Sequence, residues 1–443
     1  MGYALTSFSS VRGGPMERAA LAIGVGLLAN YCLMLTGQAI ARVFVAGTVL
    51  ALWGLVRLGA DLRTGSAKPR RLGDYGAAAF ATCGIGYLMV VYYFEILSEP
   101  LEHWDARSIW FFHAKMIWTD GALRQQGGWS HPSLAFSHPD YPKLVPAIAA
   151  QLAYLKGYWN EFLPKGGLFV MFVPLIFWIF GFRRKRASFV LLLLIFFFSL
   201  DAWLSNGYMD GYLALYCGVA LLSFGRYLSE SRDVDLYSGM CALGIAAALK
   251  NEGLLFAVCL LAALLFIRPE ARAFSAGPLV ARLRSDSVFV TVLILSIAPT
   301  LAWTIYKTAW GLQNDIAGDP SAGWSRLSGR LFDGFSPRFL FEFLTVRATA
   351  IWMLTGLLAA TALFSVRQRV KLHRGALVAA ATSGLYFCGL YVAYLSTPLG
   401  LNSHLNTSAT RTMATASMAL LVSLFFLLSD LEAHDGQPRL TRG

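Results

Sequence analysis

Long apolar runs alternate with short polar segments along the whole chain. A membrane-spanning helix needs about 20 mainly apolar residues, with a range of about 17–25. Runs of this kind predict about twelve spans, at 19–36, 43–59, 75–97, 166–182, 187–203, 211–225, 236–249, 253–267, 288–305, 346–365, 375–395 and 412–429. The pattern therefore predicts an all-α, polytopic transmembrane helix bundle that forms a single membrane-embedded domain over residues 1–443.

The composition agrees with a membrane protein. The chain is 56% hydrophobic and 14% charged, whereas soluble domains carry about 25% charged residues. Its net charge of +12 comes mostly from Lys and Arg in short loops between the predicted spans, as expected for loops on the cytoplasmic side. No basic stretch with interleaved stacking aromatics stands apart from the spans, so nucleic acid is not an expected partner.

The basic residues also predict the orientation of the chain. With the spans above, four groups fall on one side together with both termini: Arg63, Lys68, Arg70 and Arg71; Arg183, Arg184, Lys185 and Arg186; Arg268, Arg272, Arg282 and Arg284; Arg367, Arg369, Lys371 and Arg374. That side is expected to be the cytoplasm, with 430–443 as a cytoplasmic tail of a plasma (inner) membrane protein. The loops 98–165, 306–345 and 396–411 then face the extracytoplasmic side.

The first large outer loop, 98–165, contains a shorter apolar run at 144–155. This run is too short for an ordinary span, so we predict an interfacial helix on the outer leaflet. A further membrane crossing is the alternative. Tryptophans suited to the headgroup layer surround it, namely Trp104, Trp110, Trp118, Trp129 and Trp159.

Asp105 is the leading candidate for a catalytic residue, because it directly follows the apolar run at 75–97. Ionisable groups at membrane depth are costly and indicate function by default. A carboxylate among indoles at the outer surface is suited to take a proton from an acceptor hydroxyl. Its neighbours Trp104 and Arg107 are candidate substrate contacts. The alternative is an ion pair of Asp105 with Arg107 or Lys115 that orders the loop.

Asp210 is a second acid on the same predicted side. Gly207 and Gly211 flank the segment Tyr208–Met209–Asp210 and permit a tight turn and the close approach of a ligand. Two carboxylates from separate loops are suited to divide the work of a base and an orienting group. Tyr208 is a candidate substrate contact. The alternative role for Asp210 is a helix N-cap.

Charged residues in the turn at 250–252 are candidate ligands for phosphate and sugar. Lys250 and Glu252 lie between two apolar runs, although they would also neutralise each other there. His404 and Arg411 precede the last predicted span. Arg binds phosphate through two hydrogen bonds, so these two residues predict an anion pocket at the membrane surface. Interfacial anchoring by Arg411 is the alternative.

The segment 138–143 is a proline-stiffened polar stretch that leads into the apolar run at 144–155. His138 and Asp140 are candidates to line an acceptor site. A rigid turn without a binding role is the alternative.

Together these short motifs resemble the GT-C superfold of polytopic glycosyltransferases, which includes protein O-mannosyltransferases and lipid A aminoarabinose transferases. The resemblance covers roughly 75–260 and, more loosely, 390–415. Its carriers are Trp104–Asp105, the segment 138–143, the acidic turn at 208–210 and the turn at 250–253. One departure is that two predicted spans precede the span leading to Asp105, whereas the family's loop follows its first span.

The resemblance implies an inverting transfer of a hexose or pentose from a polyprenyl-phosphate donor to an extracytoplasmic glycan, lipid or protein of the cell envelope. Asp105 would be the base and Asp210 would support it. Lys250, His404 and Arg411 would bind the lipid phosphate. No cofactor is expected, although oligosaccharide-type members of the family use a divalent metal.

Two other classes of protein remain open. A transporter or flippase of lipid-linked sugars would place polar residues at the bilayer midplane, in broken helices of paired halves. A glycan polymerase or ligase would depend more on Arg and His in a large outer loop than on early acids.

Overall fold

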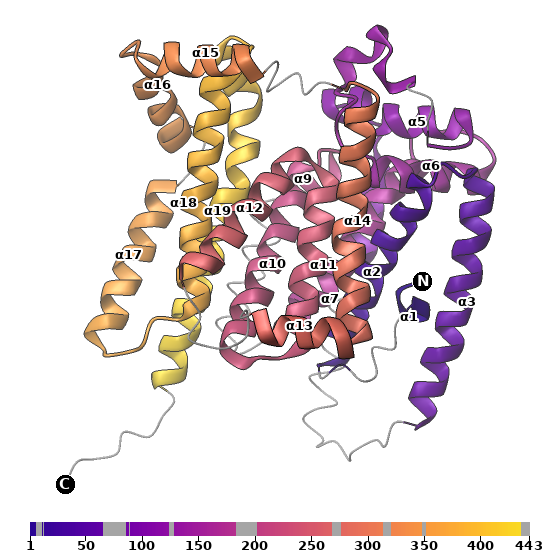
Figure 1. Ribbon diagram of the computed structural model, residues 1–443, viewed down its shortest axis with the longest axis horizontal. Coiled ribbons are helices and arrows are strands. Elements are labelled where there is room, and N and C mark those ends of the chain that lie inside the picture. Colours follow the sequence, from indigo (N-terminus) through magenta and orange to yellow (C-terminus); the bar gives the residue numbers. More distant parts are fainter. Residues whose placement is uncertain are drawn as a thin grey trace.

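The computed structural model describes residues 1–5, 11, 13–64, 86–87, 89–123, 128–182, 202–267, 276–312, 320–347 and 351–435. Over these residues the chain is all-helical and contains no strand, as the sequence predicts (Figure 1). The first half contains α1 (Gly2–Leu5), α2 (Pro15–Leu35), α3 (Ile40–Thr64), η2 (Ala106–Trp110), α5 (Phe111–Asp120), η3 (Gly128–Ser130), η4 (Pro132–Ser137), α6 (Leu144–Lys156), η5 (Leu163–Lys165) and α7 (Gly166–Gly181).

The second half contributes most of the long helices. They are α9 (Ala202–Ser205), α10 (Asp210–Glu230), α11 (Asp233–Leu249), α12 (Asn251–Phe266), α13 (Ala276–Ser285), α14 (Ser287–Ala309), α15 (Pro320–Leu331), α16 (Ser336–Glu342), η7 (Phe343–Arg347), α17 (Ile351–Arg367), α18 (Arg374–Ser396) and α19 (Leu401–Asp435).

Among the described residues, seven helices are long and apolar enough to cross a membrane. They comprise α2, the first part of α3, η5 with α7, α10, α14, α18 and α19. An eighth is reached if Ser336–Val346 and Ile351–Arg367, which meet at a bend of 68°, form one broken span. The predicted span 187–203 falls largely, and the span 75–97 about half, outside the described residues, and α11 and α12 have 17 and 16 residues. The count of about twelve stays a prediction.

The loops separate to the two ends of the bundle (Figure 1). Helix α13 and the junction between α17 and α18 lie at one end, whereas α5, α6, α15 and α16 lie at the other. Four of the predicted cytoplasmic basic residues belong to the first end, since Arg282 and Arg284 close α13, Arg367 closes α17 and Arg374 opens α18. The arrangement of these elements agrees with the predicted parity.

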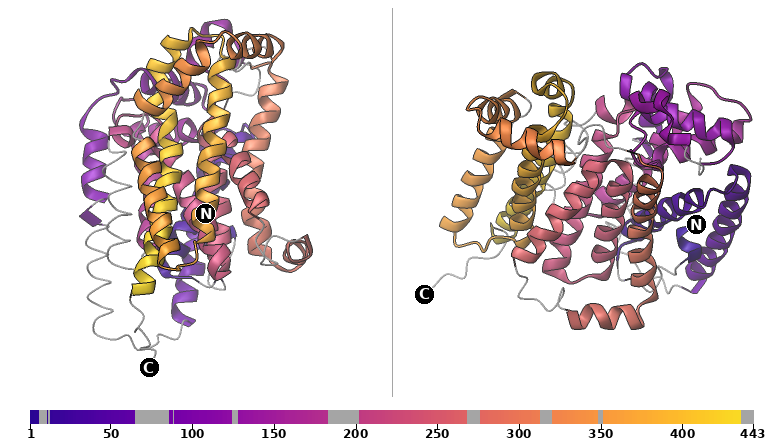
Figure 2. Two further views of the ribbon diagram at one scale, coloured as in Figure 1. Left: turned by 90° about the vertical axis from the view of Figure 1, so that its left-hand side faces the viewer. Right: turned by 45° about the horizontal axis from the view of Figure 1, so that its top comes forward.

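Helix α10 forms the centre of the bundle and is buried over its whole apolar window. It packs on α11 on one side and on α18 and α19 on the other, and the last two run side by side in both views (Figure 2). Small residues permit this close packing. A Cβ added at Gly225 would lie 2.5 Å from the ring of Phe426 and 3.1 Å from the Cα of Gly375.

The apolar run at 144–155 forms the short helix α6. Most of its first ten residues are buried, because α6 packs against α5 and α7. The helix ends at Gly157, whose φ of 83° lies in the left-handed region that glycine adopts without strain. Only its last turn exposes apolar side chains, including Tyr154 and Leu155. Its predicted place on the outer leaflet stays a prediction.

Candidate functional site

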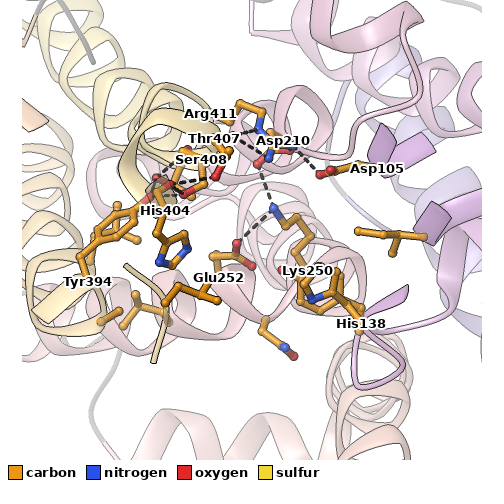
Figure 3. A pocket seen from close by; sticks show the side chains of 18 of the residues that line it. Asp105, His138, Asp210, Lys250, Glu252, Tyr394, His404, Thr407, Ser408 and Arg411 are labelled. Carbon is orange, nitrogen blue, oxygen red and sulfur yellow. Dashed lines mark hydrogen bonds and ion pairs between the residues drawn. The ribbon is translucent and has the colours of Figure 1, made fainter. Parts of the chain in front are cut away.

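A cavity of about 410 Å³ lies where the segments around 104–109 and 138–141 meet α10, α12, α18 and α19 (Figure 3). Eight of the eleven residues that we proposed from the sequence line it, namely Trp104, Asp105, His138, Asp210, Lys250, Glu252, His404 and Arg411. These residues come from five separate segments of the chain. The fold therefore brings the early acids and the late cations into one pocket.

Five charged side chains in this pocket form a continuous series of ion pairs, which we call the ion-pair chain: Asp105, Arg411, Asp210, Lys250 and Glu252. Arg411 donates a hydrogen bond to Asp105, and its Nη1 lies 3.6 Å from Asp210 Oδ2. Lys250 Nζ lies 2.9 Å from Asp210 Oδ1 and 3.1 Å from Glu252 Oε1. Negative and positive side chains alternate along the series, and dashed lines mark the ion pairs in Figure 3. Three carboxylates and two cations leave it with one net negative charge.

A tight turn places Asp210 beside Asp105. Gly207 has a φ of 87°, and a Cβ added there would lie 2.6 Å from the Cβ of Ala106. The turn therefore packs directly on η2, which begins right after Asp105. Asp210 is the first residue of α10 and Met209 takes the N-cap position, so Asp210 is not the N-cap. Its carboxylate still benefits from the positive end of the α10 dipole.

Lys250 lies between α11 and α12, as the C-cap of the first helix and the N-cap of the second. Its backbone is extended, with φ −147° and ψ 158°, and the side chain is buried. Burial by itself lowers the pKa of Lys250, but Asp210 and Glu252 more than offset this, so its pKa lies above the ordinary value. The ammonium group therefore stays protonated. Lys250 and Glu252 do form the ion pair that the sequence suggested as an alternative. Lys250 also pairs with Asp210, so it does not neutralise Glu252 alone.

His404 and Arg411 lie within a helix, which corrects a predicted boundary. We expected 396–411 to be a loop, but α19 begins at Leu401. Within this helix the hydroxyl groups are satisfied locally, because they bond to carbonyls one turn back, as Ser408 does to His404 and Thr412 does to Ser408. The polar residues of α19 that line the pocket give this part of the sequence the composition of a loop.

The other three predicted residues lie outside the pocket lining. The ring of Tyr208 lies 4.5 Å from the Arg411 guanidinium and so helps to hold it. Asp140 is buried, and its Oδ2 accepts a hydrogen bond of 2.7 Å from the amide of Asn251, a lining residue. Arg107 lines a different cavity with Lys115. Tyr208 and Asp140 therefore support the pocket, whereas Arg107 faces elsewhere.

The sequence analysis did not predict one polar residue of the lining, Tyr394. The Tyr394 hydroxyl lies 2.8 Å from Ser408 Oγ and 3.0 Å from Thr412 Oγ1, and the Tyr394 ring lies 4.8 Å from that of His404. The signal was present in the sequence. His404, Ser408, Arg411 and Thr412 follow the spacing of one helical face, which a helical reading of 401–412 would have revealed.

A buried lysine braces the segment 138–143 behind the pocket. Lys143 Nζ donates to Pro139 O at 2.9 Å and bonds to His113 Nδ1 at 3.1 Å. The indole faces of Trp129 and Trp303 lie 4.5 and 5.0 Å from it. These contacts fix the segment that carries the pocket residue His138.

His113 gives this brace a dependence on pH. The side chain is fully buried, and its Nε2 lies 3.1 Å from Ser137 Oγ. Burial, with the nearby Lys143 adding to it, holds the pKa of His113 well below its usual value of 6.5. Below about pH 6.5 His113 is therefore protonated in the unfolded chain but stays neutral in the folded chain.

We expect the wild-type protein to lose stability as the pH falls below about 6.5, by up to about 1.4 kcal/mol per pH unit from His113. The variant His113→Gln should flatten this dependence. Thermal unfolding in nanodiscs between about pH 7.5 and about pH 5 measures it. His131→Asn, at an exposed position of the same loop, is the control. Equal acid sensitivity of wild type and His113→Gln would contradict the assignment.

Over the described residues the protein is all-helical, with several helices that fit a multi-pass membrane protein and a charged pocket among the helix ends. Among the described residues, no group of three or more His, Cys, Asp or Glu side chains is arranged to hold a metal ion. No known protein family, curated protein or solved structure matches the chain. A proposal for the function therefore rests on the pocket itself.

Proposed function

We propose that this protein is an integral-membrane glycosyltransferase of the GT-C type, which moves a sugar from a polyprenyl-phosphate donor to an extracytoplasmic acceptor. The observation that carries the proposal is the meeting of Asp105 and Arg411, which lie 306 residues apart in the sequence, within one pocket. The resemblance assigns the first to the base and the second to the lipid phosphate. A purely structural role would not require Asp105 and Arg411 to line a cavity.

The transfer step balances with these groups. Asp105 accepts the proton of the acceptor hydroxyl, while the acceptor oxygen forms a bond to C1 of the sugar. The bond from C1 to the phosphate oxygen breaks, and its electron pair leaves with the polyprenyl phosphate. Attack from the opposite face inverts C1. Negative charge builds up on the leaving phosphate, so cations already in place, Arg411 and Lys250, would lower the barrier.

The remaining lining fits a sugar that carries a lipid. Leu255 and Leu390, from the apolar helices α12 and α18, form a wall next to the ion-pair chain. On the same α12, Leu254 and Val258 are exposed, as expected for a face in contact with lipid. The volume of about 410 Å³ lies within the range of about 300–1,000 Å³ for small-molecule sites. Polar and apolar parts therefore lie side by side, as an amphipathic donor requires.

Mass spectrometry of lipids and glycans from cells that lack the protein tests the proposal. We expect one glycan modification to disappear and a polyprenyl-phosphate sugar to accumulate. Wild-type protein should restore the normal profile, and Asp105→Asn should not. His131→Asn is the matched control in the same loop. An unchanged profile in the deletion strain, or full rescue by Asp105→Asn, would count against this function.

Arg411→Ala should weaken donor binding by about 1.5–3 kcal/mol, the value of a hydrogen bond to a charged group. Acceptor binding should change less, because Arg411 is assigned to the phosphate. Arg411→Lys keeps the charge but loses the paired hydrogen bonds, so its affinity for the donor should lie between those of wild type and Arg411→Ala. Calorimetric titration of purified protein in nanodiscs measures both affinities. An equal loss for donor and acceptor would contradict the role of Arg411.

A further inference from the structure

Both cations of the ion-pair chain are already occupied by carboxylates. Arg411 contacts Asp105 and Asp210, and Lys250 contacts Asp210 and Glu252. The series as a whole has a net charge of −1. An incoming phosphate would therefore have to compete with a carboxylate for each of these two cations.

The two halves of the series differ in how freely they can rearrange. The side chains of Asp210 and Lys250 are 3% and 6% exposed, whereas those of Asp105 and Arg411 are 17% and 18% exposed to the cavity. Buried pairs are costly to separate, because each ion would be left without water or a partner. At the other end, Glu252 is 16% exposed but its partner Lys250 is buried, so exchange of partners is favoured at the Asp105–Arg411 pair, in which both side chains are partly exposed.

Arg411 keeps its position when Asp105 leaves, because other contacts hold the guanidinium. Its Nε and Nη2 donate to Thr407 O at 3.2 and 2.9 Å. The ring of Tyr208 lies 4.5 Å away, and Asp210 lies 3.6 Å away. For Asp105, in contrast, Arg411 is the one ion-pair partner among the described residues. Asp105 is thus the weakly held member of the pair.

Building on the proposed function, we propose that the donor phosphate displaces Asp105 from Arg411 and thereby frees the carboxylate to act as base. Without donor, Asp105 Oδ2 accepts a hydrogen bond from the Arg411 guanidinium, so this oxygen is not open to the acceptor hydroxyl. With donor, the phosphate takes over this hydrogen bond. The donor therefore binds first, and the acceptor meets an active base only in the loaded enzyme.

This exchange makes Asp105 a competitor of the donor, which gives an unusual expectation. Asp105→Asn should bind a lipid monophosphate more tightly than wild type, by roughly tenfold, because a neutral amide competes weakly for Arg411. The probe is farnesyl phosphate, titrated into purified protein in nanodiscs. Farnesol and inorganic phosphate separate binding of the lipid chain and of free phosphate from binding of the whole headgroup.

A double-mutant cycle with Arg411→Gln separates displacement from simple charge repulsion. If Asp105 and the phosphate compete for Arg411, the tighter binding caused by Asp105→Asn disappears in the Arg411→Gln background. If Asp105 merely repels the anion, the gain persists there. Persistence of the gain would overturn the exchange.

The order of binding in the wild-type protein gives a second measurement that needs no variant. Product-inhibition kinetics should show the donor adding before the acceptor, and random order or acceptor-first order would overturn the exchange.

The outcomes of the binding experiments also separate the exchange from the proposed function. Binding of farnesyl phosphate no tighter than that of farnesol would defeat the lipid-phosphate function itself. Tight wild-type binding that Asp105→Asn leaves unchanged or weakens would defeat the exchange alone.

Discussion

Asp105→Asn is expected to reduce the turnover of sugar transfer by at least about a hundredfold, because general base catalysis contributes about 10²–10⁴-fold. The amide has the size of the carboxylate and its oxygen still accepts a bond from Arg411, so the pocket should keep its shape. It does not take up a proton at neutral pH. Initial rates of purified protein in nanodiscs, with the donor found by lipid analysis, measure the effect.

Two controls make this result informative. Thermal unfolding of Asp105→Asn should match the wild type, which excludes a folding defect, and His131→Asn should keep normal turnover. In the same preparation, Asp105→Asn should bind the donor at least as well as wild type while failing to turn it over. Wild-type turnover in Asp105→Asn would remove this residue from the mechanism.

Lys250→Met should lower the free energy of unfolding by about 3–5 kcal/mol, the usual cost of removing one partner from a buried ion pair. The side chains of Lys250 and Asp210 are 6% and 3% exposed, so the carboxylate would remain buried without its nearest cation. Its remaining cation, Arg411, lies farther away at 3.6 Å and is shared with Asp105. Denaturant unfolding in detergent micelles measures the loss.

The double variant Lys250→Met/Asp210→Asn is the matched control. Removal of the uncompensated charge should recover more than half of the lost stability, since buried ion pairs can be replaced by neutral side chains at small cost. Transfer activity should remain low in both variants. A Lys250→Met protein as stable as wild type would show that this pair does not support the fold.

The pattern of hydrophobicity predicted much of the architecture. Long apolar runs predicted a helical membrane bundle, and the helices α2, α7, α10, α14 and α18 follow them closely. The boundary at α19 was predicted wrongly, because a helix whose polar face lines a cavity has the composition of a loop. Short helices such as α11 are stabilised by packing inside the bundle, so length alone does not classify them.

The sequence by itself determined which residues to suspect. Asp105, Asp210, Lys250 and Arg411 stand out because ionisable groups are rare next to apolar runs and costly there. Their assignment to one end of the bundle also followed from the sequence, through the alternation of the spans and the positions of the basic loops.

Only the tertiary structure decided how these groups pair. The alternative drawn from the local sequence paired Asp105 with Arg107 or Lys115, yet the partner is Arg411, 306 residues further along the chain. Pairing depends on which side chains share a space from which water is excluded, and packing of distant helices creates that space. The same packing buried Lys143 and His113 together behind the pocket, because polar groups leave water only where the fold supplies other hydrogen-bond partners.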